Sequence, residues 1–127
     1  MENKHVIKIK KKEFPLVFSL GTLQRMEEFI DDFDLTKVDD ILRSTKGLLD
    51  ILYCLAEQGA IAEGRSLEED RAWFGANAPA AQRWIIQAHT IIVDTLVDGM
   101  SMETDDEDDA EVDVVLEELK KKDEKTD

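Results

Sequence analysis

Residues 47–55 read Gly-Leu-Leu-Asp-Ile-Leu-Tyr-Cys-Leu, and this run sets the fold class. Its apolar residues recur at three- and four-residue spacing, which is typical of one face of an amphipathic helix: Leu48, Ile51, Leu52 and Leu55. The pattern predicts a helix that begins near Gly47 and ends by Gly64. Because such a face is stable only when it is covered, other elements must pack around it.

Two helices are predicted before this run. The first follows Gly21, which we expect to break a preceding strand, and Thr22 would cap it. Its apolar positions again have helical spacing: Leu23, Met26, Ile30 and Phe33. A short second helix is predicted from Thr36, with Asp39 as its capping partner.

Two more helices are predicted after it. Ser66 and Glu69 have the spacing of a capping box, so a helix is expected from Ser66 through Trp73-Phe74, ending at Gly75. Pro79 suits a first helical turn, and a long last helix is predicted over residues 79–98. That helix is apolar on more than one face, so it belongs to the centre of the core or covers a partner.

The N-terminal region favours a β-hairpin over residues 5–20. Ile7 and Ile9 alternate with lysines on the first arm, and on the second arm every other residue is a large apolar one: Phe14, Leu16 and Phe18. The polar stretch 10–13 between the arms is expected to form the turn. Pro15 has no N–H to donate, so it should lie at an edge or at a strand start. The fold class is therefore mainly α: a small domain of about five helices with an N-terminal hairpin.

The charge divides the 127-residue, 14.5 kDa chain into two parts. Residues 103–127 hold 13 acidic and 4 basic side chains, which is −9 of the net −14. We therefore expect a helical domain over 1–102 and a flexible acidic tail over 103–127, with a short helix at 112–122. This charge argues against a nucleic-acid partner. The longest apolar stretch, residues 84–97, is too short to span a membrane.

No catalytic, cofactor or metal site is predicted. The chain lacks a phosphate-binding glycine loop, a nucleophile elbow and a Cys-x-x-Cys pair. His89 has Ile85 and Val93 four residues away, so no metal-ligand spacing surrounds it. The acidic run 105–109 lacks the glycine of a calcium loop. Cys54 lies in an apolar run and is expected to be a small buried residue.

The apolar residues exceed what a core of about 100 residues needs, which favours a protein that binds other proteins. The candidate contact residues lie on the hairpin, on two helices and on a C-terminal stripe: Phe14, Leu16, Phe18, Trp73, Phe74, Trp84, Val112, Val115, Leu116 and Leu119. The stripe is of a kind that folds on a partner. The same surfaces would also allow a homo-oligomer.

The order of these features resembles a known family. Phe18-Ser19-Leu20-Gly21 closes the hairpin, Glu27-Glu28 lies on the next helix, and the apolar helix 48–55 follows. With the small size and the acidic C-terminus, this resembles the tail assembly chaperones of long-tailed, non-contractile bacteriophages and prophages. The resemblance implies a non-enzymatic protein of the bacterial host cytoplasm. It would bind the tape measure protein and the tail tube protein during assembly, and it would be absent from the mature virion.

Many members of that family are made in a short form and a frameshifted long form, and this chain would be the short form. Two other functions stay open. One is a small acidic regulatory or decoy protein that binds a basic host target, and salt would weaken that binding strongly. The other is a structural virion component, such as a head–tail connector, which purified particles would contain.

Overall fold

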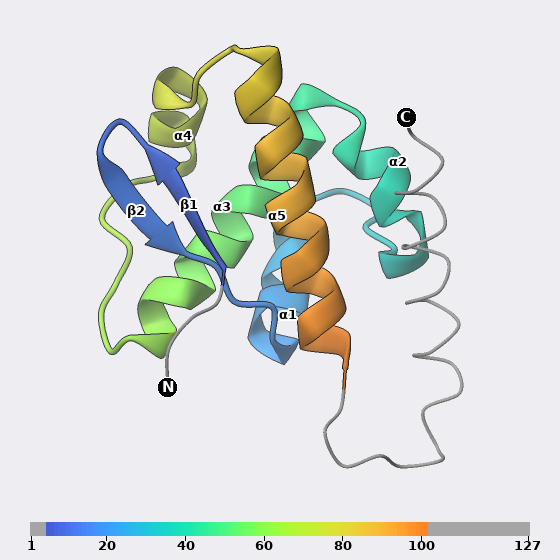
Figure 1. Ribbon diagram of the computed structural model, residues 1–127. Coiled ribbons are helices and arrows are strands. Elements are labelled where there is room, and N and C mark those ends of the chain that lie inside the picture. Colours follow the sequence, from blue (N-terminus) through green and yellow to red (C-terminus); the bar gives the residue numbers. More distant parts are fainter. Residues whose placement is uncertain (1–4, 102–127) are drawn as a thin grey trace.

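The computed structural model describes residues 5–101, and the predicted mainly helical domain with an N-terminal hairpin is confirmed there (Figure 1). The elements in chain order are β1 (Val6–Ile9), β2 (Lys12–Pro15), α1 (Leu20–Phe29), the 3₁₀ turn η1 (Leu35–Lys37), α2 (Val38–Leu42), α3 (Thr45–Ala62), α4 (Arg71–Asn77) and α5 (Gln82–Met100). The expected tail over 103–127 and the expected helix at 112–122 lie outside the described residues.

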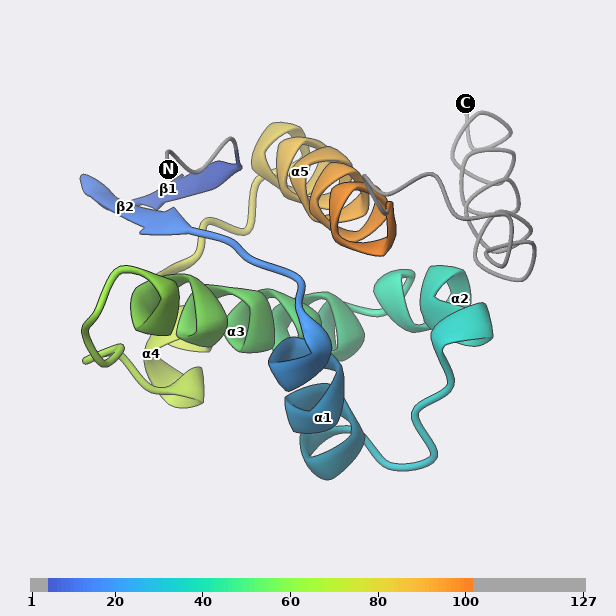
Figure 2. The ribbon, with the colours of Figure 1, turned by 90° about the horizontal axis from the view of Figure 1, so that it is seen from below.

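Helix α3 is the centre of the domain. The hairpin and α5 lie on one side of it, α1 and α4 lie on the other, and α2 lies beyond its N-terminal end (Figure 2). The stripe predicted from the sequence is buried as expected, with Ile51, Leu52 and Leu55 fully inaccessible to solvent. The helix runs from Thr45 and is followed by Gly64 in the left-handed conformation (φ 82°), which confirms the predicted end.

The hairpin turn is tighter than the four-residue turn predicted. Ile9 pairs with Lys12, so only Lys10 and Lys11 form the turn, and both have positive φ angles (50° and 69°). That geometry normally selects Gly or Asn, which is why the sequence did not indicate it. The strand alternation places Ile7 and Ile9 in the core and Lys8 in solvent, as predicted.

The second strand ends at Pro15 and does not continue to residue 20. The N–H of Leu16 donates to the His5 carbonyl (2.9 Å), so Pro15 occupies the alternate position, where an N–H would point away from β1. Proline is thus accommodated at an edge, as expected. The N–H of Val17 then donates to Leu55 of α3 (3.2 Å), because no third strand is present to receive it within the described fold.

Helix α1 begins earlier than predicted. Its N-cap is Ser19, and Gly21 lies inside its first turn where a break was expected. Thr22 is the third helical residue: its hydroxyl accepts from the Ser19 N–H (3.0 Å) and donates to the Val17 carbonyl (2.7 Å). The helix ends at Phe29 and does not reach Phe33.

The caps of the next segment also differ from the prediction. Asp34 caps η1 by accepting from the Thr36 N–H (3.0 Å), so Thr36 lies inside the turn. Asp39 is buried in α2 and accepts from Arg43 (3.2 Å), so it does not act as a capping partner for Thr36.

The predicted capping box at Ser66 is wrong. Helix α4 starts at Arg71, after Asp70, whose carboxylate accepts from the Trp73 N–H (2.8 Å). Glu69 cannot serve as the reciprocal partner because it binds Lys12 of the hairpin. The helix continues through Gly75 to Asn77 and stops where Ala78 is extended before Pro79.

The last helix is displaced along the chain. It was predicted over residues 79–98, and it extends from Gln82 to Met100. Pro79 therefore lies in the connection between α4 and α5 and not in a first helical turn.

Candidate protein-binding site

A pocket of about 210 Å³ opens at the N-terminal ends of α3 and α5. Three segments form it: the α2–α3 junction with the first turns of α3, the end of α4 with the connection to α5, and the first turn of α5. Its lining is mainly apolar and consists of Leu42, Arg43, Ser44, Thr45, Leu48, Leu49, Gly75, Ala78, Pro79, Ala80, Trp84 and Ile85.

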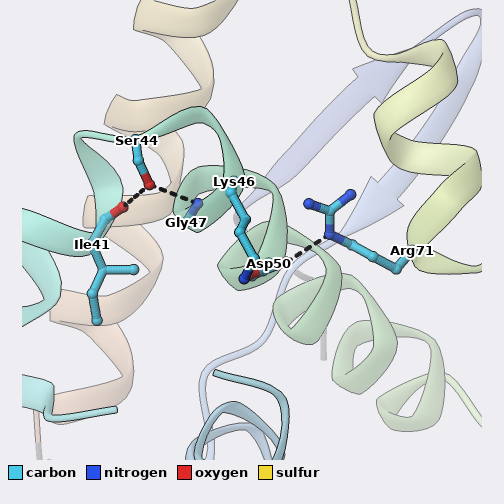
Figure 3. A network of polar contacts seen from close by, with 6 residues as sticks. All are labelled: Ile41, Ser44, Lys46, Gly47, Asp50 and Arg71. Atoms are coloured by element: carbon cyan, nitrogen blue, oxygen red, sulfur yellow. Dashed lines mark hydrogen bonds and ion pairs between the residues drawn. The ribbon is translucent and has the colours of Figure 1, made fainter. Parts of the chain in front are cut away.

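Two hydrogen bonds of one serine hydroxyl hold the α2–α3 junction together. Ser44 caps α3 by accepting from the Gly47 N–H (2.9 Å), and its hydroxyl donates back to the Ile41 carbonyl (3.2 Å) (Figure 3). A Cβ on residue 47 would lie 1.9 Å from that carbonyl oxygen, so only glycine allows this approach. The junction therefore presents Leu42 and Leu48 in a fixed arrangement.

A buried carboxylate joins α3 to α4. Asp50 is 2% exposed and accepts from Lys46 (2.6 Å) and from Arg71 at the start of α4 (2.7 Å) (Figure 3). This pairing anchors α4, and the connection that follows α4 forms one wall of the pocket. Sequence reasoning missed Asp50 as a structural residue. The available signal was an acidic residue inside an apolar run, four residues after a lysine.

The start of α5 exposes two apolar side chains, one of which lines the pocket. Ile85 lines it and is 40% exposed, and the adjacent Ile86 is 57% exposed. Trp84 is partly buried, and its indole N–H donates to the Lys8 carbonyl of β1 (3.1 Å). Trp84 thus links the hairpin to the pocket and covers the outer edge of β1.

Basic groups lie close to the pocket although the chain is acidic. Arg43 lines it, and its exposed guanidinium pairs with Asp39 and Asp40. Lys46 is exposed near the start of α3. Arg83 is exposed next to Trp84 in the sequence and makes no ion pair with residues 5–101.

The structure separates the candidate contact residues predicted from the sequence. Phe14, Leu16 and Phe74 are buried in the core, so the apolar hairpin face is covered by the domain itself. Trp73 is partly buried, with its ring 5.6 Å from that of Phe14. Phe18 is partly buried and packs on the core.

Of the predicted contact residues, Trp84 alone lines the pocket among those within residues 5–101. Val112, Val115, Leu116 and Leu119 lie outside the described residues. Most of the pocket lining comes from turns and helix ends, where no hydrophobic period marks it in the sequence.

The chemistry of the described residues is limited. Burial raises the pKa of the Cys54 thiol to about 12, so the thiol stays protonated and is a poor nucleophile at neutral pH. Its predicted burial is confirmed. His5 lies at the domain surface with Nε2 2.6 Å from an Asp98 carboxylate oxygen. Residues 5–101 contain no cluster of three His, Cys, Asp or Glu side chains placed to hold a metal ion.

None of the helices in this part of the chain is both long and apolar enough to cross a bilayer. The chain matches no protein-family model, and comparisons with curated proteins and with solved structures gave no match.

Proposed function

We propose that this chain is a non-enzymatic chaperone that binds an apolar helical segment of another protein through the pocket at the first turn of α5. By the sequence resemblance, the client is the tape measure protein of a phage or prophage tail, bound together with tail tube subunits. The chaperone acts in the cytoplasm of the bacterial host and leaves before the virion is complete.

The observation that supports the proposal is the coincidence of a preformed apolar pocket with exposed aliphatic side chains. Ile85 and Ile86 are 40% and 57% exposed, and covering each by a partner would contribute about 1 kcal/mol. The pocket walls are held by the Ser44 cap and the Asp50 pairs, so little ordering is needed on binding. A net charge of −14 keeps such a body in solution while it exposes apolar surface.

Co-expression with the tape measure protein of the same genome tests the proposal. We expect the chain to raise the soluble fraction of the tape measure protein and to co-purify with it. Ile85→Gln should weaken this effect. The matched control is Ile61→Gln, which makes the same change at a 55% exposed position at the far end of α3. An unchanged soluble fraction, or equal effects of the two variants, would contradict the proposal.

Salt and virion analysis separate it from the two alternatives. Apolar binding should survive about 0.5 M salt, whereas a charge decoy should be released. Mass spectrometry of purified particles should detect a head–tail connector but not this chaperone.

A further inference from the structure

We propose that the pocket also has an occupant within the chain itself: the apolar stripe of residues 112–119, which lies outside the described residues. The stripe consists of Val112, Val115, Leu116 and Leu119, whose three- and four-residue spacing in the sequence would place them on one side of a helix formed on docking. Docking of this segment is independent of the proposed function. That it competes with a client, and so regulates binding, rests on the proposed function.

Chain length permits this docking. The described residues end at Ser101, directly after α5, and Trp84 of the pocket lies sixteen residues before Met100 on the same helix. At 1.5 Å per residue the stretch from Met100 to Trp84 measures about 24 Å. Residues 101–112 span up to about 36 Å when extended. The stripe therefore reaches the pocket without any rearrangement of the fold.

The volume of the pocket suits the aliphatic side chains of the segment, and a basic residue near the pocket suits its charge. A cavity of about 150 Å³ holds a benzene molecule, so about 210 Å³ accommodates aliphatic side chains such as Leu116 and Leu119. The stripe is bordered by acidic residues, including Asp113, Glu117 and Glu118. Arg83, which precedes Trp84 in the sequence and makes no ion pair with residues 5–101, is the basic group free to receive them, because Arg43 and Lys46 already pair with carboxylates of the domain.

Tethering makes even a weak contact effective. A segment on a short flexible linker has an effective concentration in the millimolar range. If its intrinsic dissociation constant is about 0.1 mM, the pocket is filled in roughly ten of eleven molecules. A client would then bind about ten-fold more weakly to the intact chain than to a chain with a broken stripe.

Methyl NMR of the full chain tests the docking directly. Leu116→Gln with Leu119→Gln should shift the methyl signals of Leu49 and Ile85 and leave those of Ile61 unchanged. The matched control is Val114→Gln, because Val114 lies in the same segment on the opposite side from the stripe. Identical pocket spectra for the wild type and the stripe variant would overturn the proposal.

A spin label supplies a second measurement. Attached to Val114→Cys, it should broaden the Ile85 methyl signal but not that of Ile61, and the buried Cys54 should not react with the label. Broadening that appears only at high protein concentration, with a dimer in sedimentation, would assign the pocket to the segment of a second copy and overturn the intramolecular proposal.

Affinity for the tape measure protein separates this inference from the proposed function. Stripe variants should bind the client about ten-fold more tightly than the wild type. If the NMR shows docking but the client affinity is unchanged, the stripe and the client do not compete, and the regulatory part fails while docking stands. If the NMR shows no docking but Ile85→Gln still weakens client binding, the inference fails and the proposed function stands.

Discussion

Substitution of Gly59 by alanine is the sharpest test of how α3 supports the hairpin. An ideal Cβ at this position would lie 1.8 Å from the Pro15 carbonyl oxygen and 2.5 Å from its carbon. Ordinary contact begins near 3.4 Å, so the helix and the end of β2 would have to separate. Both neighbours are backbone atoms of packed elements, so no flexible side chain can absorb the difference.

The expected effect follows from three contributions. Alanine gains about 1 kcal/mol over glycine in a helix interior. Overpacking at a contact this close costs about 1–3 kcal/mol. Separation also weakens the nearby hydrogen bond from Val17 to Leu55 (3.2 Å), which contributes about 1 kcal/mol. The net expectation is a loss of roughly 1–3 kcal/mol in the free energy of unfolding, with Tm falling about 4–8 °C for each kcal/mol.

Urea and thermal unfolding, followed by circular dichroism, measure this loss. The matched control is Gly75→Ala in α4, where the nearest atom to the new Cβ is a side-chain atom, Nη1 of Arg71, at 3.2 Å and no backbone atom lies as close as at Gly59. Both substitutions have the same helix propensity gain, so their difference isolates the hairpin contact. Gly75→Ala should be neutral or stabilising by up to about 1 kcal/mol. The reasoning is refuted if Gly59→Ala is as stable as Gly75→Ala.

Three further outcomes are expected. Cys54 should resist thiol reagents at pH 8 until urea unfolds the chain, and rapid labelling of the folded protein would contradict this. Because the folded pKa of about 12 exceeds the unfolded value of about 8.5, the free energy of unfolding should fall as the pH rises from about 8.5 to about 12. Asp50→Ala should lower the free energy of unfolding in urea by about 2 kcal/mol, because it leaves Arg71 (26% exposed) without its partner. A double-mutant cycle with Arg71→Met should show coupling between the two residues, and additive losses of stability would count against the pairing. The hydrogen bond from Lys12 lowers the pKa of Glu69, so the Glu69 carboxylate stabilises the fold at pH values above its ordinary pKa and loses this effect as the pH falls. Lys12→Met should raise the pKa of Glu69 in an NMR titration and lower the free energy of unfolding by less than about 1 kcal/mol. An unchanged pKa would exclude Lys12 as the cause.

The hydrophobic periods predicted which segments are helical or extended, but local signals misplaced several ends. Ser66 and Glu69 have the spacing of a capping box, yet Glu69 binds Lys12, which lies 57 residues earlier in the chain. Asp70 then caps α4 in place of Ser66. A capping motif in the sequence shows only which residues could form local hydrogen bonds, and a residue distant in the chain can bind one of them instead.

The site was predictable only in part. Trp84 could be chosen by residue type, and the structure places it on the pocket. The hairpin face could not be assigned from its pattern, because an apolar face looks the same in sequence whether the domain or a partner covers it. Phe14 and Leu16 are in fact covered by the domain.

The sequence by itself determined the helical class, the hairpin and the buried stripe of α3, because hydrophobic spacing of two or of three to four residues specifies local geometry and the side to be buried. Only the tertiary structure decided which apolar side chains remain at the surface and where the pocket forms. That outcome depends on close backbone approaches at Gly47 and Gly59 and on the Asp50 pair, which join segments far apart in the chain. Such contacts have no period, so they become visible only when the elements are packed.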